Sequence, residues 1–155
     1  MCSVQYIVTA QKLDVTLPAD FITAEQGSSS TLRCKFTVDG QTPATCEGVN
    51  IKWRKRRNDG TPYDEIWRVE SERNIGVGSY ATKLTGTSAT LTTLNRYGHA
   101  VTFTSIEKDD EEEYWCHVDC FTGSRWAWGD SPRIRVIVNS KYILYYTSHN
   151  PHIIS

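Results

Sequence analysis

Short segments in which apolar and polar residues alternate run along most of the chain. Leu32, Cys34 and Phe36 alternate with Arg33 and Lys35. The same two-residue period returns at Val49, Ile51 and Trp53, at Val101 and Phe103, at Tyr114, Cys116 and Val118, and at Ile134, Val136 and Val138. Because successive side chains of a β-strand point to opposite faces, each segment predicts a strand with one buried face. No window sustains an apolar period of 3.6 residues, so the pattern predicts an all-β protein.

Turn-forming residues separate the segments. Asn58-Asp59-Gly60 and Asn95-Arg96-Tyr97-Gly98 are strong turn signals. Between them, Ile66–Val69 predicts another short strand, and the threonine-rich segment Tyr80–Leu94 predicts one arm of a hairpin. Leu13–Leu17 reads as the opening strand. Eight or nine short strands without a helix predict a sandwich or a barrel, and alternation alone does not choose between them.

The cysteine positions limit the disulfide pairings. If Tyr114–Val118 is a strand, residues four positions apart lie about 13 Å from each other, too far for a disulfide, so a Cys116–Cys120 bridge is excluded. Leaving Cys2 aside, two pairings remain: Cys34–Cys116 with Cys46–Cys120, or the crossed alternative. Cys34 and Cys116 both lie within strand segments among inward-pointing apolar residues, which favours the first pairing.

The number and spacing of cysteines also bear on environment and on metal binding. Five cysteines in 155 residues are typical of a secreted or surface-exposed chain, so we expect an extracellular location. No Cys-x₂-Cys pair occurs, and we expect neither a zinc site nor any other metal or cofactor. Cys2 is the odd cysteine, and an intermolecular bridge and a cloning remnant are both open explanations.

Several residues stand in the order and spacing of a known family. Gly27, Leu32-Arg33-Cys34 and Trp53 are followed by Asp110-x-x-x-Tyr114-Trp115-Cys116, a pattern that resembles the immunoglobulin V-set. In that family two cysteines bridge strands B and F, the tryptophan packs on the bridge and the tyrosine forms a corner. The resemblance implies an immunoglobulin V-type Greek-key β-sandwich over residues 13–138, flanked by an N-terminal extension (1–12) and a C-terminal tail (139–155). Its framework residues are Leu32, Trp53, Asp110 and Tyr114.

The last strand segment sharpens the resemblance. Trp128-Gly129-Asp130-Ser131-Pro132-Arg133-Ile134-Arg135-Val136 is similar to the joining segment of antigen receptors, with Ser131 and Pro132 replacing a glycine and a threonine. The family usually pairs the residue equivalent to Asp110 with an arginine, and here Lys83 is the nearest candidate. These departures point away from a mammalian antibody and toward an early-chordate or innate immune-type receptor.

The segment that follows Cys120 is rich in residues found at binding hot spots. Phe121–Trp128 contains one phenylalanine, one arginine and two tryptophans. We expect Phe121, Arg125 and Trp126 to bind a ligand, and the joining-segment match predicts that Trp128 packs against the sandwich. A Cys46–Cys120 bridge would hold this F–G loop beside the B–C loop, so the two loops form the expected recognition surface.

The outward positions of strands C, C′ and F suggest a second surface. An outward tryptophan calls for a covering partner, and V-set domains commonly pair through the face formed by strands G, F, C and C′. The resemblance therefore implies a homodimer or V–V pairing. The alternative is that loops of the same chain cover Trp115 and no partner is needed. The expected interface residues are Arg54, Trp67, Trp115, His117 and Trp128.

The remaining function classes are poorly supported. A net charge of −1 offers no field for nucleic acid, and we expect contact with a membrane only through a segment absent from this chain. The four histidines are scattered, no Gly-x-Ser-x-Gly turn occurs, and we expect no enzyme. The sequence therefore predicts a ligand-recognition domain of a cell-surface or secreted immune-type receptor that binds a protein or another extracellular ligand. The competing hypothesis is a homophilic adhesion module.

Overall fold

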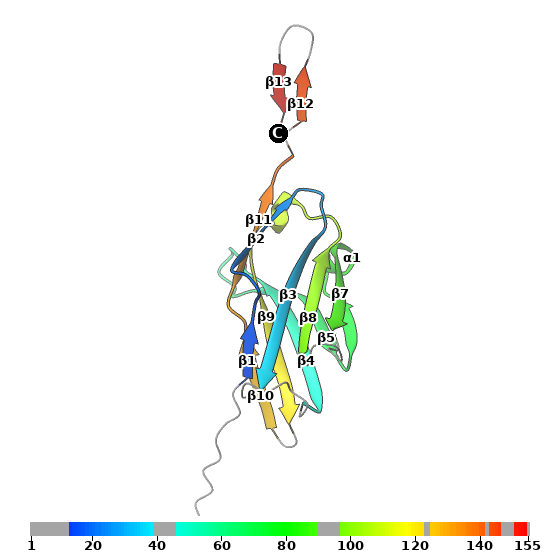
Figure 1. The fold of residues 1–155 in the computed structure, drawn as a ribbon, viewed down its shortest axis with the longest axis vertical. Coiled ribbons are helices and arrows are strands. Elements are labelled where there is room, and N and C mark those ends of the chain that lie inside the picture. Colours follow the sequence, from blue (N-terminus) through cyan, green and yellow to red (C-terminus); the bar gives the residue numbers. More distant parts are fainter. Residues whose placement is uncertain are drawn as a thin grey trace, which may run out of the picture.

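Two β-sheets face each other and enclose the core. The computed structural model describes residues 13–38, 46–89, 97–122, 125–141, 143–146 and 151–154. Figure 1 shows the strands of the two layers running along the long axis of the molecule. The first sheet contains, in order, β1 (Leu13–Thr16), β3 (Ser30–Val38), β8 (Tyr97–Phe103) and β7 (Leu84–Ala89). All its pairs are antiparallel.

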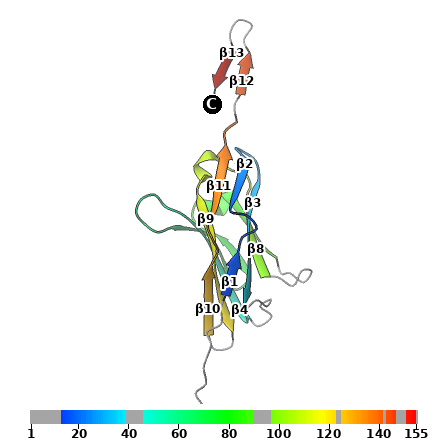
Figure 2. The ribbon, with the colours of Figure 1, turned by 60° about the vertical axis from the view of Figure 1, so that its left-hand side comes forward.

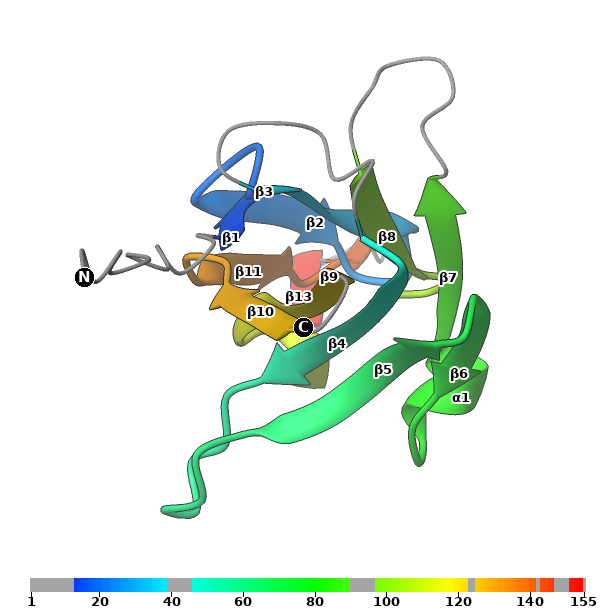
Figure 3. The ribbon, with the colours of Figure 1, turned by 90° about the horizontal axis from the view of Figure 1, so that it is seen from below.

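The second sheet is larger. It contains, in order, β2 (Phe21–Glu25), β11 (Ile134–Asn139), β9 (Glu113–Thr122), β4 (Gly48–Lys55), β5 (Asp64–Glu70) and β6 (Arg73–Gly76), and β10 (Arg125–Asp130) also pairs with β9. Strands β5 and β6 extend this sheet beyond the strands that carry Trp53 and Cys116, as C′ and C″ do in variable-type domains. In Figure 3 the two layers separate, with β3 and β8 in one and β10, β4 and β5 in the other.

The chain changes sheets at its first described strands. β1 pairs with β3 in the first sheet, whereas β2 pairs in parallel with β11 in the second. Pro18, between them, lacks a backbone N–H and interrupts any continuous ladder. This switch closes one edge of the sandwich, and the fold is the predicted all-β, V-type Greek-key sandwich.

Two short helical turns and one hairpin complete the described chain. They are α1 (Tyr80–Lys83), the 3₁₀ turn η1 (Lys108–Asp110), and the hairpin of β12 (Ile143–Tyr146) with β13 (Pro151–Ile154). Figures 1 and 2 both place this hairpin beyond the end of β11. No helix in the described ranges is long and apolar enough to cross a membrane.

The prediction of a hairpin arm from residue 80 onward is correct for β7 and wrong for Tyr80–Lys83. Gly78 has a φ of 58°, a conformation that suits glycine, and it turns the chain into α1. Ala81 then donates a backbone hydrogen bond to the Gly78 carbonyl. Residues 90–94 lie outside the described part of the chain.

The core follows the alternation seen in the sequence. Leu32, Trp53, Val101 and Tyr114 are each 0% exposed, and the other large buried side chains are Phe36, Ile66, Phe103, Ile106, Val118, Ile134 and Val136. Burying aromatic and branched apolar side chains of this size contributes about 1.5–3 kcal/mol each relative to leaving them in water. These side chains come from both sheets, so the apolar contacts hold the two layers together.

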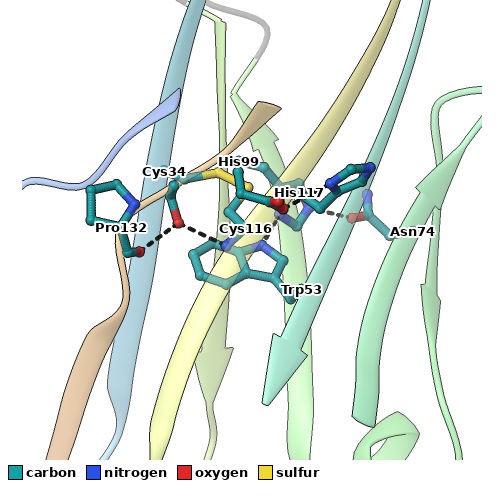
Figure 4. The surroundings of a disulfide bond; sticks show 9 residues. Cys34, Trp53, Asn74, His99, Cys116, His117 and Pro132 are labelled. Carbon is teal, nitrogen blue, oxygen red and sulfur yellow. Dashed lines mark hydrogen bonds and ion pairs between the residues drawn. A yellow bond between two sulfur atoms is a disulfide. The ribbon is translucent and has the colours of Figure 1, made fainter. Parts of the chain in front are cut away.

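The two disulfides have the pairing that the sequence favours. Cys34 on β3 is bonded to Cys116 on β9, with 6.4 Å between their Cα atoms, and joins the two sheets. Cys46 is bonded to Cys120, with a Cα separation of 5.5 Å. Figure 4 shows Trp53 beside the first bridge.

The turn before β9 has the geometry of a tyrosine corner. The Tyr114 hydroxyl donates a 2.6 Å hydrogen bond to the Asp110 carbonyl, and burial raises the pKa of this phenol, which keeps the donor proton in place. The Asp110 carboxylate accepts a hydrogen bond from the Glu107 amide and forms an ion pair with Lys83 at 3.2 Å. Lys83 therefore pairs with Asp110, the residue for which the V-set resemblance made it the nearest candidate.

Ser131, one of the two departures in the joining segment, has a structural role. Its hydroxyl accepts a 2.9 Å hydrogen bond from the Cys116 amide and donates one to the Pro132 carbonyl. Its own amide donates to the Cys116 carbonyl. The three bonds fix the interruption between β10 and β11 directly beside the Cys34–Cys116 bridge (Figure 4).

Candidate functional site

The F–G segment is mostly a hairpin of two strands rather than the predicted loop. Phe121 belongs to β9, and Arg125–Asp130 form β10, with Trp126 opposite Phe121 and Trp128 opposite Asp119. Along β10 the exposed tryptophans alternate with the buried Ala127 and Gly129. Because side chains two residues apart on a strand share a face, both indoles lie on the outer face of the second sheet.

Two tryptophans are the most exposed large aromatic side chains of this hairpin. Trp126 is 56% exposed and Trp128 is 65% exposed. The prediction that Trp128 packs against the sandwich is therefore wrong, because its neighbours Ala127 and Gly129 occupy the inward positions instead. The ring of Trp126 contacts Phe121, with centroids 5.2 Å apart. Arg125 is exposed at the start of β10, next to Trp126 in the sequence and opposite Thr122, and no contact within the described part of the chain joins it to the Phe121–Trp126 pair.

A histidine between two carboxylates borders the exposed tryptophans. The His117 Nδ1 lies 2.8 Å from an Asp130 oxygen, and its Nε2 lies 3.2 Å from an Asp119 oxygen. The His117 ring centroid is 5.9 Å from that of Trp128. Arg54 reaches the same Asp130 oxygen at 3.6 Å. The outer face at β10, β9 and β4 thus combines an aromatic ridge with a charged, hydrogen-bonding centre.

Trp115 points outward but is covered by its own chain. It is only 5% exposed, because the Arg133 guanidinium stacks 3.7 Å from its ring centroid and Tyr63 packs edge-on with centroids 5.7 Å apart. Arg54 covers Tyr63 in the same way at 4.2 Å. The inference from an uncovered Trp115 to a partner surface therefore loses its basis, and the alternative of self-coverage is correct.

Trp67 is a core residue and not an outward one. It is opposite Trp53 in the β4–β5 pairing, is 6% exposed and belongs to the buried apolar cluster. A register shift between Trp53 and Arg54 places the outward side chains of β5 at other positions than simple alternation predicts. A direct role for Trp67 in an outer interface is excluded by this orientation.

A buried polar network joins the core tryptophans to the edge of the sheet, and the sequence interpretation missed it. Trp53 Nε1 donates to His99 Nδ1 at 2.9 Å, His99 Nε2 lies 2.8 Å from Asn74 Oδ1, and Trp67 Nε1 donates to the same oxygen at 3.1 Å. Figure 4 shows Trp53, His99 and Asn74 in this chain beside the bridge. The signal was available, because His99 continues the inward period of Val101 and Phe103.

Burial determines the protonation of His99. The side chain is 2% exposed, and burial lowers its pKa from 6.5 to about 4. Since Nδ1 accepts from Trp53, the neutral ring carries its proton on Nε2 and donates to Asn74. The network is therefore structural, with every polar atom of the ring engaged.

The second disulfide fastens the entry to β4 onto the strand that leads to the exposed tryptophans. Cys120 lies inside β9, opposite Val49 and Ala127, and not at the start of a loop. Next to it, the Glu47 amide donates a 2.7 Å hydrogen bond to the Phe121 carbonyl. Residues 39–45, which contain most of the B–C loop, lie outside the described part of the chain.

A charged hollow separates the β4–β5 turn from η1. It is lined by Lys55, Arg56, Arg57, Asn58, Asp59, Asp64, Lys108, Asp109, Glu111 and Glu112, and Figure 2 shows the turn projecting from the body. Hydrogen bonds from Thr61 and Arg57 hold the pKa of Asp59 far below its usual value. Arg57 also pairs with Asp64 at 2.9 Å. The charges of the hollow largely satisfy one another, and no metal-binding group of three side chains occurs among the described residues.

Comparison with known proteins supports the fold alone. No family model and no curated protein matches the chain. Among solved structures, that of murine CRIg is similar with a TM-score of 0.65 at 16% sequence identity, over 82% of this chain and 98% of that one. Since 1920 solved chains match, the fold is widely shared, and a function has to be argued from the outer face of the second sheet.

Proposed function

We propose that this chain is the ligand-recognising V domain of a cell-surface or secreted immune-type receptor, antigen-receptor-like in its joining strand, and that it works by binding and not by catalysis. The observation that carries the proposal is the pair of exposed tryptophans on β10, 56% and 65% exposed. Exposed aromatic clusters of this kind are typical of interaction sites. The two disulfides favour an extracellular location.

The proposed ligand surface consists of Phe121, Arg125, Trp126 and Trp128 together with the B–C loop, whose described end, Cys46 and Glu47, is bonded to β9. It stands on rigid strands, because β9 is hydrogen-bonded on both sides and held by both disulfides. A pre-ordered surface loses little conformational entropy on binding. We assign ligand binding to this hairpin end of the sandwich within a domain of residues 13–138.

An array of extracellular protein ectodomains, incubated with multimerised domain, tests the proposal. Binding to at least one protein is expected, and Trp126→Ala should weaken it by about 30-fold, the effect of a hot-spot residue of about 2 kcal/mol. Phe21→Ala is the matched control, since Phe21 is 61% exposed on the distant strand β2. Equal loss in both variants, or binding unaffected by either, would place the ligand site elsewhere.

Pairing through the G–F–C–C′ face is the second part of the proposal. Arg54, His117 and Trp128 lie on this face, whereas Trp67 does not and Trp115 is covered. Sedimentation equilibrium should detect a dimer in the micromolar range, weakened by Trp128→Ala. If the protein is strictly monomeric at high concentration, the pairing proposal is wrong. Ligand recognition is tested separately by the ectodomain array.

One observation favours the alternative of a homophilic adhesion module. The same face carries carboxylates at its β10 side, Asp119 and Asp130, and a cation on β4, Lys52, which lies opposite His117. A two-fold axis would bring the acidic side of one copy against the basic side of the other. Adhesion predicts that beads coated with the domain alone aggregate, and that Trp126→Ala abolishes the aggregation.

A further inference from the structure

Aromatic rings on the outer face of the second sheet fall into two sets. Tyr63 and Trp115 are each covered by an arginine of the same chain, Arg54 at 4.2 Å and Arg133 at 3.7 Å. Among the described residues, neither Trp126 nor Trp128 has such a cation over its ring. A guanidinium placed over an indole face is attracted by the ring quadrupole and removes apolar surface from water.

Carboxylates stand beside the uncovered rings. Asp119 is directly opposite Trp128 in the β9–β10 pairing, and Asp130 is the next outward residue along β10. Opposite residues of an antiparallel pair have Cβ atoms about 4.5–5.5 Å apart, so Asp119 is within reach of any group that covers Trp128. Asp130 is exposed and shared by His117 and Arg54. The hairpin therefore offers two indole faces with anionic groups next to them.

The spacing of the two indoles defines the form of a matching ligand. Trp126 and Trp128 are two residues apart on one strand, about 6.8 Å along it. An extended peptide repeats side chains on one face at the same interval. Cations at alternate positions of such a peptide can cover both rings in turn and reach Asp119 and Asp130.

We propose that the partner of the β9–β10 hairpin presents an extended basic segment with arginine or lysine at alternate positions, seated on Trp126 and Trp128 and paired with Asp119 and Asp130. This inference rests on the proposed ligand-binding function and names the chemistry of its partner. Arginine is the better fit, because its planar guanidinium stacks on the indole while its N–H groups bond to a carboxylate.

The indole N–H signals in a ¹⁵N–¹H NMR spectrum test the proposal directly, with five tryptophans as internal probes. The ligands are the peptide acetyl-Gly-Arg-Gly-Arg-Gly-amide and its counterpart with citrulline, which keeps the shape and hydrogen-bonding groups of arginine without its charge. The arginine peptide should shift the Trp126 and Trp128 signals and bind about fivefold more tightly than the citrulline peptide at low salt. Trp53 and Trp67 are bonded inside the protein and should not move.

Variants locate the contribution of each group. Asp119→Asn with Asp130→Asn should remove most of the preference for arginine over citrulline while the indole signals still respond. Phe21→Ala, the exposed aromatic control on β2, should change nothing. Added salt should weaken the arginine peptide more than the citrulline peptide.

Several outcomes would overturn the inference. Three results would show that the hairpin does not select a basic segment. They are equal affinity for the two peptides, unchanged Trp126 and Trp128 indole signals, and NMR shifts confined to residues of the charged hollow near Arg57. Since pairing through the G–F–C–C′ face would itself shift Trp128, the peptide response is read at a protein concentration below the dimer range. Shifts of Trp126 that follow protein concentration but not peptide concentration would identify a second copy as the occupant. If an array partner needs Trp126 but tolerates loss of its own basic residues, the proposed function stands and this inference is wrong.

Discussion

The core around the Cys34–Cys116 bridge and the β9–β10 hairpin use tryptophan in opposite ways. In the core, Trp53 is 0% exposed and Trp67 is 6% exposed, and each indole nitrogen donates to a side chain of the same chain. On the hairpin, Trp126 and Trp128 are more than half exposed. The same residue type therefore contributes to stability in one region and presents an apolar surface to solvent in the other.

The difference follows from which face of the second sheet a position occupies. Inward positions of β4 and β9 face the first sheet, and changes there disturb a closely packed interior. Outward positions of β10 face solvent, with only small residues, Ala127 and Gly129, turned toward the core. A fold of this kind can change its outer aromatic residues with little effect on folding, which suits a recognition surface.

The largest effect should come from Trp53→Ala. The substitution creates a large cavity and leaves His99 Nδ1 without its donor, so the free energy of unfolding should fall by about 3–5 kcal/mol. Urea denaturation followed by circular dichroism measures the loss. A decrease below about 1 kcal/mol would mean that the buried network does not support the core as argued.

The free energy of unfolding should depend on pH through His99, the titratable member of the buried Trp53–His99–Asn74 network. Because the pKa of His99 is 6.5 when unfolded and about 4 when folded, the unfolded chain binds the proton first as the pH falls. The associated stability is fully present above pH 6.5 and is lost progressively between pH 6.5 and 4, by up to about 3 kcal/mol.

His99→Gln isolates this contribution. Glutamine can accept from Trp53 and donate to Asn74 without titrating, so its stability should vary less between pH 6.5 and 4 than that of the parent. Carboxylates with lowered pKa values, such as Asp59 and Glu111, remain in both proteins and cancel in the difference. Parallel pH curves for parent and variant would show that His99 does not titrate in this window.

The second disulfide connects the two regions and should have an intermediate effect. Replacing Cys46 and Cys120 together by serine opens an additional loop on the order of 15 residues, which corresponds to about 3 kcal/mol or less in the chain-entropy model. The Cys34–Cys116 bridge and the core should keep the variant folded at 25 °C, with a lower Tm. Calorimetry and near-UV circular dichroism check both statements, and loss of the folded near-UV signal at 25 °C contradicts them.

The fold could be predicted from the sequence because core residues recur at every second position of each strand. Cys34, Trp53, Tyr114 and Cys116 lie at inward positions of strands whose neighbours alternate, and the buried pattern of the structure repeats that alternation. The pairing of Lys83 with Asp110 followed from the absence of the family's arginine. The core positions depend on local register, which a sequence displays directly, whereas Lys83 was a candidate only through the V-set resemblance.

The outer face was predicted less well because exposure depends on long-range contacts. Trp115 is covered by Arg133 and Tyr63, which are distant in sequence and lie just before β11 and β5. Trp67 points inward because it lies opposite the inward Trp53 and two residues from the buried Val69, a pairing that its own sequence segment does not show. The joining-segment match predicts that Trp128 packs against the sandwich, yet Ala127 and Gly129 hold the inward positions of β10. Alternation identifies the face of a residue but not what lies over it.

The smallest effect on stability is expected where the largest effect on binding is proposed. Trp126→Ala and Trp128→Ala remove side chains that are 56% and 65% exposed, and surface substitutions outside special sites usually change the free energy of unfolding by no more than about 0.5 kcal/mol. Loss of the contact with Phe121 adds to the effect of Trp126→Ala, so Trp128→Ala should be the closer of the two to the parent. Urea denaturation curves of parent and variants measure these differences, with Trp53→Ala as the opposite extreme. If Trp126→Ala destabilised the domain by more than about 2 kcal/mol, the hairpin tryptophans would be structural like those of the core, and the division between the two regions would not hold.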